Sequence, residues 1–191
     1  MGKGRLEAFS DGVLAILITI MVLELHVPRG ADMAVLRPML PSFASYLLSF
    51  IYLGIYWNNH HHLLHAARQV DGAILWANMN LLFWLSLVPF ATAWMGTNHF
   101  APMPVAVYGA SLFMPAIAYH LLTRALLRRH GAGSTLAKAL GSDFKGKLSI
   151  LAYALGIGVA CRMPALALGI YVAVALYWLV PDRRISRALE G

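Results

Sequence analysis

Residues 5–25 read RLEAFSDGVLAILITIMVLEL, so a charged and polar cluster runs directly into a long apolar segment. The cluster places Ser10 and Asp11 on that segment, at its polar entry. A charge at the entry of a spanning helix is costly unless it is paired or faces water, so it usually marks a functional site. The stretch therefore predicts a membrane helix that carries a functional element.

The composition of the whole chain is that of an integral membrane protein. Of its 191 residues, 60% are hydrophobic and 12% are charged, and the mean hydropathy is +0.66. These values lie far from those of a soluble globular chain. No polar stretch is long enough for a separate domain, so we expect one membrane domain over residues 1–191. The single cysteine, Cys161, excludes an intrachain disulfide framework.

Six apolar segments follow one another along the chain, and a membrane helix needs about 20 residues. The predicted spans are 6–27, 42–66, 72–96, 104–127, 147–161 and 164–180. The last two are separate because one helix over 147–180 would be about 50 Å long, against a hydrocarbon core of about 30 Å. We therefore expect a turn at 162–164, an all-α fold, and kinks at Pro89 and Pro115.

The basic residues predict the orientation in the membrane. Most of the 15 lysines and arginines fall in the two termini and in the connections after the second and fourth spans. Only Arg29, Arg37 and Arg162 belong to the other side. Basic loops stay on the cytoplasmic side of a membrane, so both termini are expected in the cytoplasm. The expected location of the protein is the plasma membrane. The positive charge favours contact with anionic lipid rather than nucleic acid. The segment 128–147 is the expected flexible linker.

The first apolar segment has a continuous aliphatic stripe. At about 100° per residue, Ile16, Ile20 and Leu23 fall within roughly 60° of one another, and Thr19 flanks them. By itself such a stripe is more often a surface that contacts lipid or another helix.

The pattern Arg-x-x-x-Phe-Ser-Asp, formed by Arg5, Phe9, Ser10 and Asp11, resembles the signature of the endosomal and lysosomal potassium channel family (transmembrane protein 175). The bacterial members of that family with one six-helix repeat are similar to this chain in length. The resemblance implies a homotetramer in a lipid bilayer, with the first helix lining a pore for potassium ions. It also implies that large aliphatic residues after the Phe-Ser-Asp cluster form the constriction.

Carried over by position, Ile16 matches the principal constriction, Ile20 and Leu23 match the next rings outward, and Thr19 is the polar pore-lining residue. Copies of Ile16 around a symmetry axis would form an apolar neck that closes by dewetting. No Thr-Val-Gly-Tyr-Gly sequence is present, so a carbonyl filter of the usual potassium-channel kind is not expected.

The second span ends in a polar cluster at the depth of Ser10 and Asp11. It contains Trp57, Asn58, Asn59 and the histidines 60–62. We expect Asp11 to hydrogen-bond to an imidazole together with an indole or amide of this cluster. Which histidine is its partner stays open, and Trp57, Asn58 and His61 are the expected members of the supporting network. Asp11 lies roughly 140° from Ile16 around the helix, which favours a supporting role over ion coordination. Asn78 and Asn80 on the third span are placed to extend the network.

Two other classes of function remain open. A proton-coupled secondary transporter would use Asp11 and Glu24, and a haem or metal membrane enzyme would use His61, His65 and His120. The histidines lack acidic or cysteine ligands, and no catalytic nucleophile is evident. We therefore expect a channel without catalytic residues, metal or cofactor, with potassium as the permeant ion.

Overall fold

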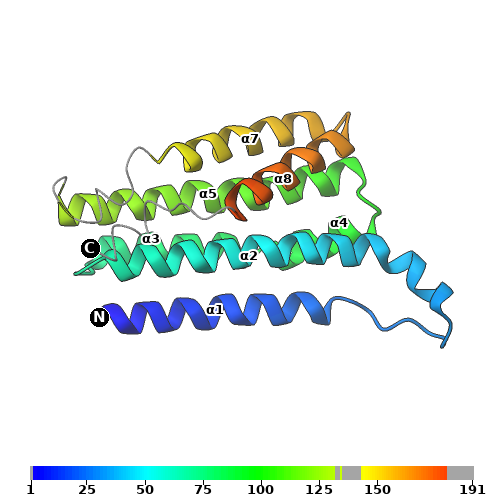
Figure 1. Cartoon of the computed structure of the whole chain (residues 1–191), viewed down its shortest axis with the longest axis horizontal. Helices are drawn as coiled ribbons and strands as arrows, with labels where there is room; N and C mark the ends of the chain where they lie inside the picture. Colours follow the sequence, from blue (N-terminus) through cyan, green and yellow to red (C-terminus); the bar gives the residue numbers. More distant parts are fainter. Residues whose placement is uncertain (1, 132–133, 135–142, 180–191) are drawn as a thin grey trace.

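The computed structural model describes residues 2–131, 134 and 143–179, and every element in these ranges is helical. The elements are α1 (Lys3–Leu23), the 3-10 helix η1 (Met33–Met39), α2 (Leu40–Ala66), α3 (Gly72–Leu85), α4 (Val88–Thr97), α5 (Pro102–His130), α7 (Phe144–Ala160) and α8 (Pro164–Leu179). They run up and down beside one another as an elongated bundle (Figure 1). The all-α prediction is confirmed.

Four helical stretches in the described chain are long and apolar enough to cross a membrane: Lys3–Leu23, Met33–Ala66, Gly72–Thr97 and Pro102–His130. The helices α7 and α8 have 17 and 16 residues. At about 1.5 Å per residue each is roughly 25 Å long, a little less than the hydrocarbon core. The first four predicted spans thus match helices of spanning length, while the last two match shorter helices.

Local sequence signals explain where the helices begin and break. The Asp71 carboxylate accepts a hydrogen bond from the Ile74 backbone amide at 3.0 Å and so caps the start of α3. The third predicted span divides into α3 and α4 because Pro89, in the first turn of α4, lacks the amide that would continue the ladder. The kink expected at Pro89 is therefore confirmed, whereas α5 continues through Pro115 without interruption.

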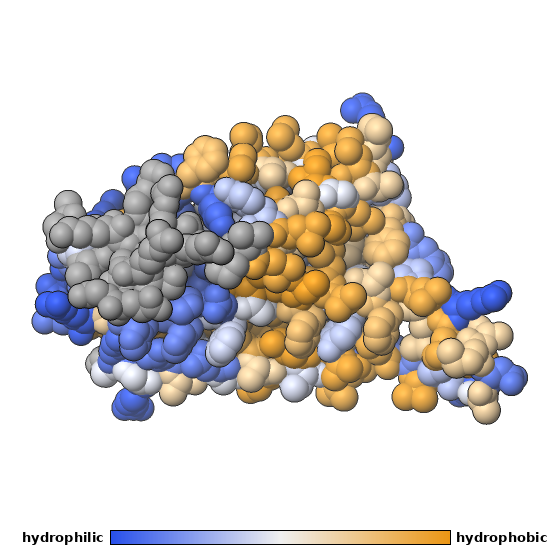
Figure 2. Space-filling view, in the orientation of Figure 1, coloured by the Kyte–Doolittle hydropathy of each residue, from blue (hydrophilic) through white to orange (hydrophobic). Residues whose placement is uncertain are grey.

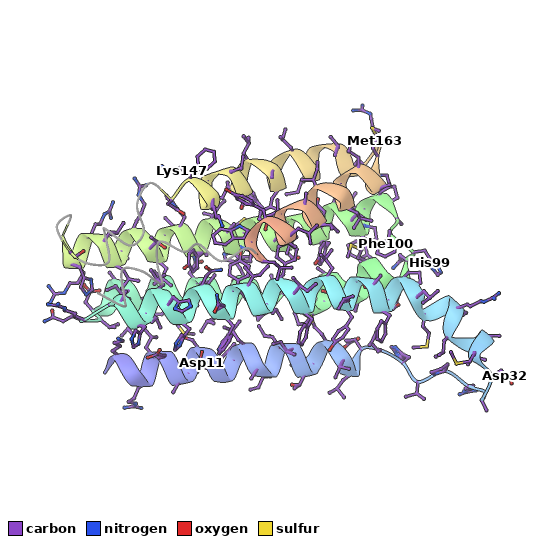
Figure 3. The ribbon with its side chains drawn as sticks, viewed as in Figure 1. Asp11, Asp32, His99, Phe100, Lys147 and Met163 are labelled. Atoms are coloured by element: carbon purple, nitrogen blue, oxygen red, sulfur yellow. The ribbon has the colours of Figure 1, made fainter. Side chains whose placement is uncertain are left out.

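The expected turn between the last two spans is also present. The helix α7 ends at Ala160 and α8 begins at Pro164, which needs no amide at a helix start. Figure 3 shows Met163 in this turn, at the end of the bundle opposite the N-terminus. The expected linker 128–147 lies partly outside the described residues. The basic residues near the C-terminus, Arg183, Arg184 and Arg187, lie wholly outside them.

Figure 2 shows a largely orange middle of the bundle with hydrophilic residues at both ends. Most lysines and arginines of the described chain belong to segments at the N-terminal end, among them Lys3, Arg68 and Arg129, whereas Arg29, Arg37 and Arg162 belong to the other end. Hydrogen bonds connect several of the segments at the N-terminal end. Lys3 Nζ donates to the carbonyl of His65 at 2.9 Å, and Arg129 donates to the Gln69 side chain at 2.7 Å. The charge asymmetry predicted from the sequence is therefore an asymmetry between the two ends of the bundle.

Two groups of buried apolar side chains form the core. The α1 core joins α1, α2, α3 and α5 through residues such as Leu14, Leu53, Leu81 and Leu122. The tyrosine core joins α2, α4, α5, α7 and α8, and Tyr171 lies at its centre. Gly109 on α5 and Gly156 on α7 leave room for the Tyr171 ring, since a Cβ at either position would overlap it. Close helix packing at a small residue is typical of membrane proteins.

Candidate functional site: the two faces of α1

The helix α1 lies at the edge of the bundle and packs against α2, α3 and α4 (Figure 1). Its buried side chains recur every three or four residues, as one face of an α-helix requires: Leu6, Ser10, Leu14, Leu17 and Met21. We call these residues the inward face. Because all its partners lie on one side, the rest of α1 is uncovered in the single chain.

The predicted pore residues lie on the uncovered side. The exposed fractions are 58% for Ile16, 39% for Ile20 and 79% for Leu23, whereas Leu14 is only 1% exposed. Thr19 is exposed beside them, and its hydroxyl donates to the Ile16 carbonyl at 2.8 Å. We call Ile16, Thr19, Ile20 and Leu23 the outward face. The structure brings these four residues together on one surface of the protomer.

A hydrogen-bonded chain of buried polar side chains holds the inward face to its neighbours. The Asn78 amide on α3 donates to the Ser10 hydroxyl at 2.9 Å, and its oxygen pairs with His60 Nε2 on α2 at 2.7 Å. Ser10 in turn donates to the carbonyl of Leu6 at 2.8 Å. Ser10, His60 and Asn78 are each at most 1% exposed. Three helices are thus connected where an unpaired polar group would be costly.

The environment of Asp11 differs from the expected one. Figure 3 shows Asp11 on α1 where the helix faces α2. Its Oδ1 atom is buried without a hydrogen-bond partner, although its charge acts on the nearby His60 ring. On α1 the described carboxylate that meets a histidine of this cluster is Glu7, whose Oε1 lies 3.3 Å from His61 Nδ1. Among the described residues Asp11 thus lacks the expected hydrogen bond.

The other residues proposed for the supporting network lie nearer the surface. The Trp57 ring stacks on His61 with centroids 6.1 Å apart, and His61 stacks on His65 at 6.0 Å. Trp57 is 47% exposed, and Asn58 and Arg5 are also exposed. Phe9 of the signature is 47% exposed. In the single chain, only Ser10 among the proposed residues belongs to the buried hydrogen-bonded chain.

Two contributors were not singled out from the sequence, namely Glu7 and His60. Helical spacing contains a signal for both. Glu7 lies four residues before Asp11, and His60 lies between the buried residues Leu53 and Leu64 on one face of α2. Periodicity can identify such a face, but it does not tell which of three consecutive histidines points toward Asn78.

Within the described ranges no group of three or more His, Cys, Asp or Glu side chains is arranged to hold a metal ion. The polar chemistry around α1 is therefore that of hydrogen bonds and one Glu–His pair. Such an arrangement can fix the position of a helix and leave its other face free.

Comparisons with known proteins agree with this architecture. The sequence profile of the endosomal/lysosomal potassium channel TMEM175 matches residues 5–89. A potassium channel of Chryseobacterium sp. (strain P1-3) is 58% identical over 190 residues, covering 100% of this chain and 99% of that protein. The endosomal/lysosomal proton channel TMEM175 of Mus musculus is 31% identical over 148 residues, covering 68% of this chain and 29% of that protein.

One solved structure is also similar. The crystal structure of a lysosomal potassium-selective channel TMEM175 homolog from Chamaesiphon minutus aligns with a TM-score of 0.77 at 27% identity. The alignment covers 93% of this chain and 96% of that one. The fold, the membrane helices and these relatives define a multi-pass ion channel of the lipid bilayer, not an enzyme. The chain belongs to the TMEM175 channel family.

Proposed function

We propose that the protein is a potassium-permeable cation channel in which four identical chains surround one pore. In this arrangement α1 of each subunit lines the pathway, Ile16 forms the narrowest ring, and Ile20 and Leu23 form the next rings. Thr19 supplies a polar group between them. The whole chain, 1–191, acts as one domain, and potassium passes without a bound cofactor.

The observation that carries the proposal is the division of α1 into two faces. Leu14 and Leu17 are at most 5% exposed, while Ile16, between them in sequence, is 58% exposed. One face is thus committed to the bundle and the other is available to a symmetric partner. A rotation axis beside α1 would repeat Ile16 around the pathway, and a narrow apolar ring can gate conduction by dewetting.

The names of the relatives support potassium as the permeant ion. The Chryseobacterium protein is named a potassium channel, and the Chamaesiphon protein is described as a homologue of the lysosomal potassium-selective channel TMEM175. The contacts of Ser10, Glu7 and Asp11 with α2 and α3 would support α1 from behind, leaving ion passage to the outward face. Trp57, Asn58 and His61, with Arg5 and Phe9, would complete this support in the assembled channel.

We further propose a plasma-membrane location with both termini in the cytoplasm. The N-terminal end of the bundle carries most of the basic residues of the described chain, including Lys3, Arg68 and Arg129. Positive residues flanking membrane helices favour the cytoplasmic side.

Flux from vesicles tests the function directly. Purified protein is reconstituted into liposomes loaded with potassium, and dissipation of the gradient is followed with a potential-sensitive dye. We expect a flux above that of protein-free liposomes, larger for potassium than for sodium. Equal fluxes without protein would contradict the channel proposal. A flux that saturates and requires a second ion would instead show a coupled transporter.

Protons are a second candidate for the permeant ion, because the mouse relative is named a proton channel. The same vesicles, loaded with a pH-sensitive dye and placed in a pH gradient, measure this directly. Proton flux without potassium flux would overturn potassium as the main permeant ion.

A further inference from the structure

The segment that joins α1 to α2 projects beyond the rest of the bundle. Figure 1 shows the chain leaving α1, passing through η1 and returning to α2 outside the ends of the neighbouring helices, and Figure 3 labels Asp32 at its tip. No residue from 24 to 40 is buried within the described chain. We call residues 27–40 the outer segment. Packing within one protomer therefore does not account for its hydrophobic side chains.

These hydrophobic side chains are large and well exposed. Val27 is 90% exposed, Met33 80% and Leu40 62%, and Leu36 is exposed as well. A 3-10 helix has three residues per turn, so side chains three apart lie above one another. Met33, Leu36 and Met39 therefore share one edge of η1, which we call the apolar edge.

The exposed hydrophobic surface continues from η1 along α2. Phe43, Leu47 and Phe50 are exposed, and they recur every three or four residues, so they share one face of the helix. Because α2 belongs to a membrane-spanning stretch, this face lies at membrane depth. The apolar edge of η1 thus adjoins a surface that is already inside the bilayer.

The length of the second spanning stretch places the outer segment at the membrane surface. Met33–Ala66 has 34 residues, or about 50 Å of helix, whereas the hydrocarbon core is about 30 Å thick. The opposite end of the stretch becomes polar at Asn58. A span of about 20 residues counted back from Asn58 reaches Pro38. The helix η1 therefore lies at the level of the lipid headgroups.

Charged side chains lie between the hydrophobic ones. The outer segment contains Arg29, Asp32 and Arg37, all of them exposed. Gly30 adopts a φ of +125°, and a Cβ there would lie 3.0 Å from Val35 Cγ1. This turn brings the chain beside Arg29 back against η1, so the two arginines belong to one compact unit. An arginine guanidinium can form two parallel hydrogen bonds to a phosphate.

This combination fits a phospholipid surface better than another protein chain. The core of a protein–protein interface is depleted of charged residues, whereas Arg37 directly follows Leu36 on η1. At a membrane surface the same mixture is favourable. Hydrophobic side chains enter the acyl region, and arginines lay their stems along it while their charged heads reach the phosphates.

We propose that the outer segment is a membrane-surface anchor that binds glycerophospholipid headgroups at the end of the bundle opposite the N-terminus. The apolar edge of η1 enters the lipid, and Arg29 and Arg37 bind the headgroup phosphates. The anchor holds the connection between α1 and α2 at a fixed depth. It depends on the membrane-spanning fold and not on the pore assignment.

Spin labelling of the full chain in phosphatidylcholine nanodiscs tests where η1 lies. The labels are attached to M33C and, as a control at the tip beside Asp32, to A31C, both with Cys161, the one native cysteine, replaced by serine. Molecular oxygen concentrates in lipid and a water-soluble nickel chelate in water, so the ratio of the two accessibilities reports the surroundings of a label. We expect this ratio to be at least fivefold higher for M33C than for A31C.

The same two accessibilities separate the other surroundings of Met33. Equal ratios for M33C and A31C, with high nickel accessibility, would place η1 in water and overturn the anchor. Low accessibility of the M33C label to both oxygen and nickel would place η1 against a second copy of the chain, which would also overturn it.

Two changes test the binding of phosphate. In M33C, the double substitution R29Q and R37Q should raise nickel accessibility at least twofold, whereas R162Q, an exposed arginine at the same end of the bundle, should leave it unchanged. Nanodiscs of digalactosyldiacylglycerol, a lipid without phosphate, should raise it similarly without any change of the arginines. If the label responds to neither change, or equally to R162Q, phosphate recognition by Arg29 and Arg37 is overturned.

Discussion

Asn78 is the side chain on which the contact between α1, α2 and α3 depends. It is fully buried and bonds both Ser10 and His60. In N78A each partner would lose its hydrogen bond in a dry environment, at a cost of about 1–3 kcal/mol. We expect a clearly lower thermal midpoint of the oligomer in detergent, measured by fluorescence-detected size-exclusion chromatography.

Asn80 on the same helix provides the matched control. Within the described residues, its oxygen accepts a hydrogen bond from the Trp84 indole alone, one turn along α3, at 3.2 Å. N80A should therefore lower the midpoint much less than N78A. If the two variants were equally stable, the buried chain would not be what positions α1.

Ile16 is the residue at which a change should alter conduction. It is 58% exposed on the outward face, and I16N would make a proposed constriction wetter. We expect higher single-channel conductance and a smaller preference for potassium over sodium, measured in planar bilayers.

V22N is the control for I16N, because Val22 is also exposed, at 46%, but lies about 120° away around the helix. It should leave conductance and ion preference unchanged. An effect of V22N without one of I16N would mean that a different face of α1 lines the pathway.

At the level of the helices, the packing of α7 on α8 depends on one small residue. A methyl group at Gly156 would overlap the Tyr171 ring, while the same group at Gly158 meets no described atom within 4 Å. Overpacking costs about 1–3 kcal/mol, more than the roughly 1 kcal/mol that alanine gains over glycine in a helix. G156A should therefore lower the thermal midpoint of the purified protein.

G158A should maintain or raise that midpoint, since it gains helix propensity without a clash. A stable G156A together with a destabilised G158A would show that α7 is rotated relative to the packing described above.

The helices themselves were largely predictable from the sequence, since apolar length and prolines set their bounds. Pro89 indicated the break that separates α3 from α4, and Pro164 marked the start of α8. The two faces of α1 followed from the helical period. The pairing of Glu7 rather than Asp11 with His61 did not, because periodicity gives the direction of a side chain on its own helix but not the rotation of the neighbouring helix.

For the whole molecule, the first expectation concerns assembly. One α1 at the edge of a bundle cannot enclose a pathway, so the channel needs several copies. Light scattering in detergent should give a protein mass four times that of the 20.9 kDa chain. A monomer that still conducts potassium would exclude a pore formed by several α1 helices.

The second expectation concerns the orientation of the chain in the membrane, which chemical labelling of Cys161 can measure. This cysteine is exposed near the turn between α7 and α8, at the end opposite the N-terminus. With the N-terminus in the cytoplasm, a membrane-impermeant maleimide added to intact cells should label Cys161. The variant C161S with G2C, which moves the thiol to the other end, should be labelled only after lysis. The reverse pattern would invert the proposed topology.

The helix α1 contributes buried residues to the α1 core and none to the tyrosine core. Its inward face is therefore constrained by packing within the chain, and its outward face is not. The inward face must match α2 and α3 of its own chain, whereas in the proposed tetramer Ile16, Thr19, Ile20 and Leu23 would need to match only copies of themselves. If α1 lines the pore as proposed, we expect that changes in the outward face can accumulate without repacking the protomer. Transplanting those four positions between relatives should exchange their permeation properties while each recipient keeps its own scaffold.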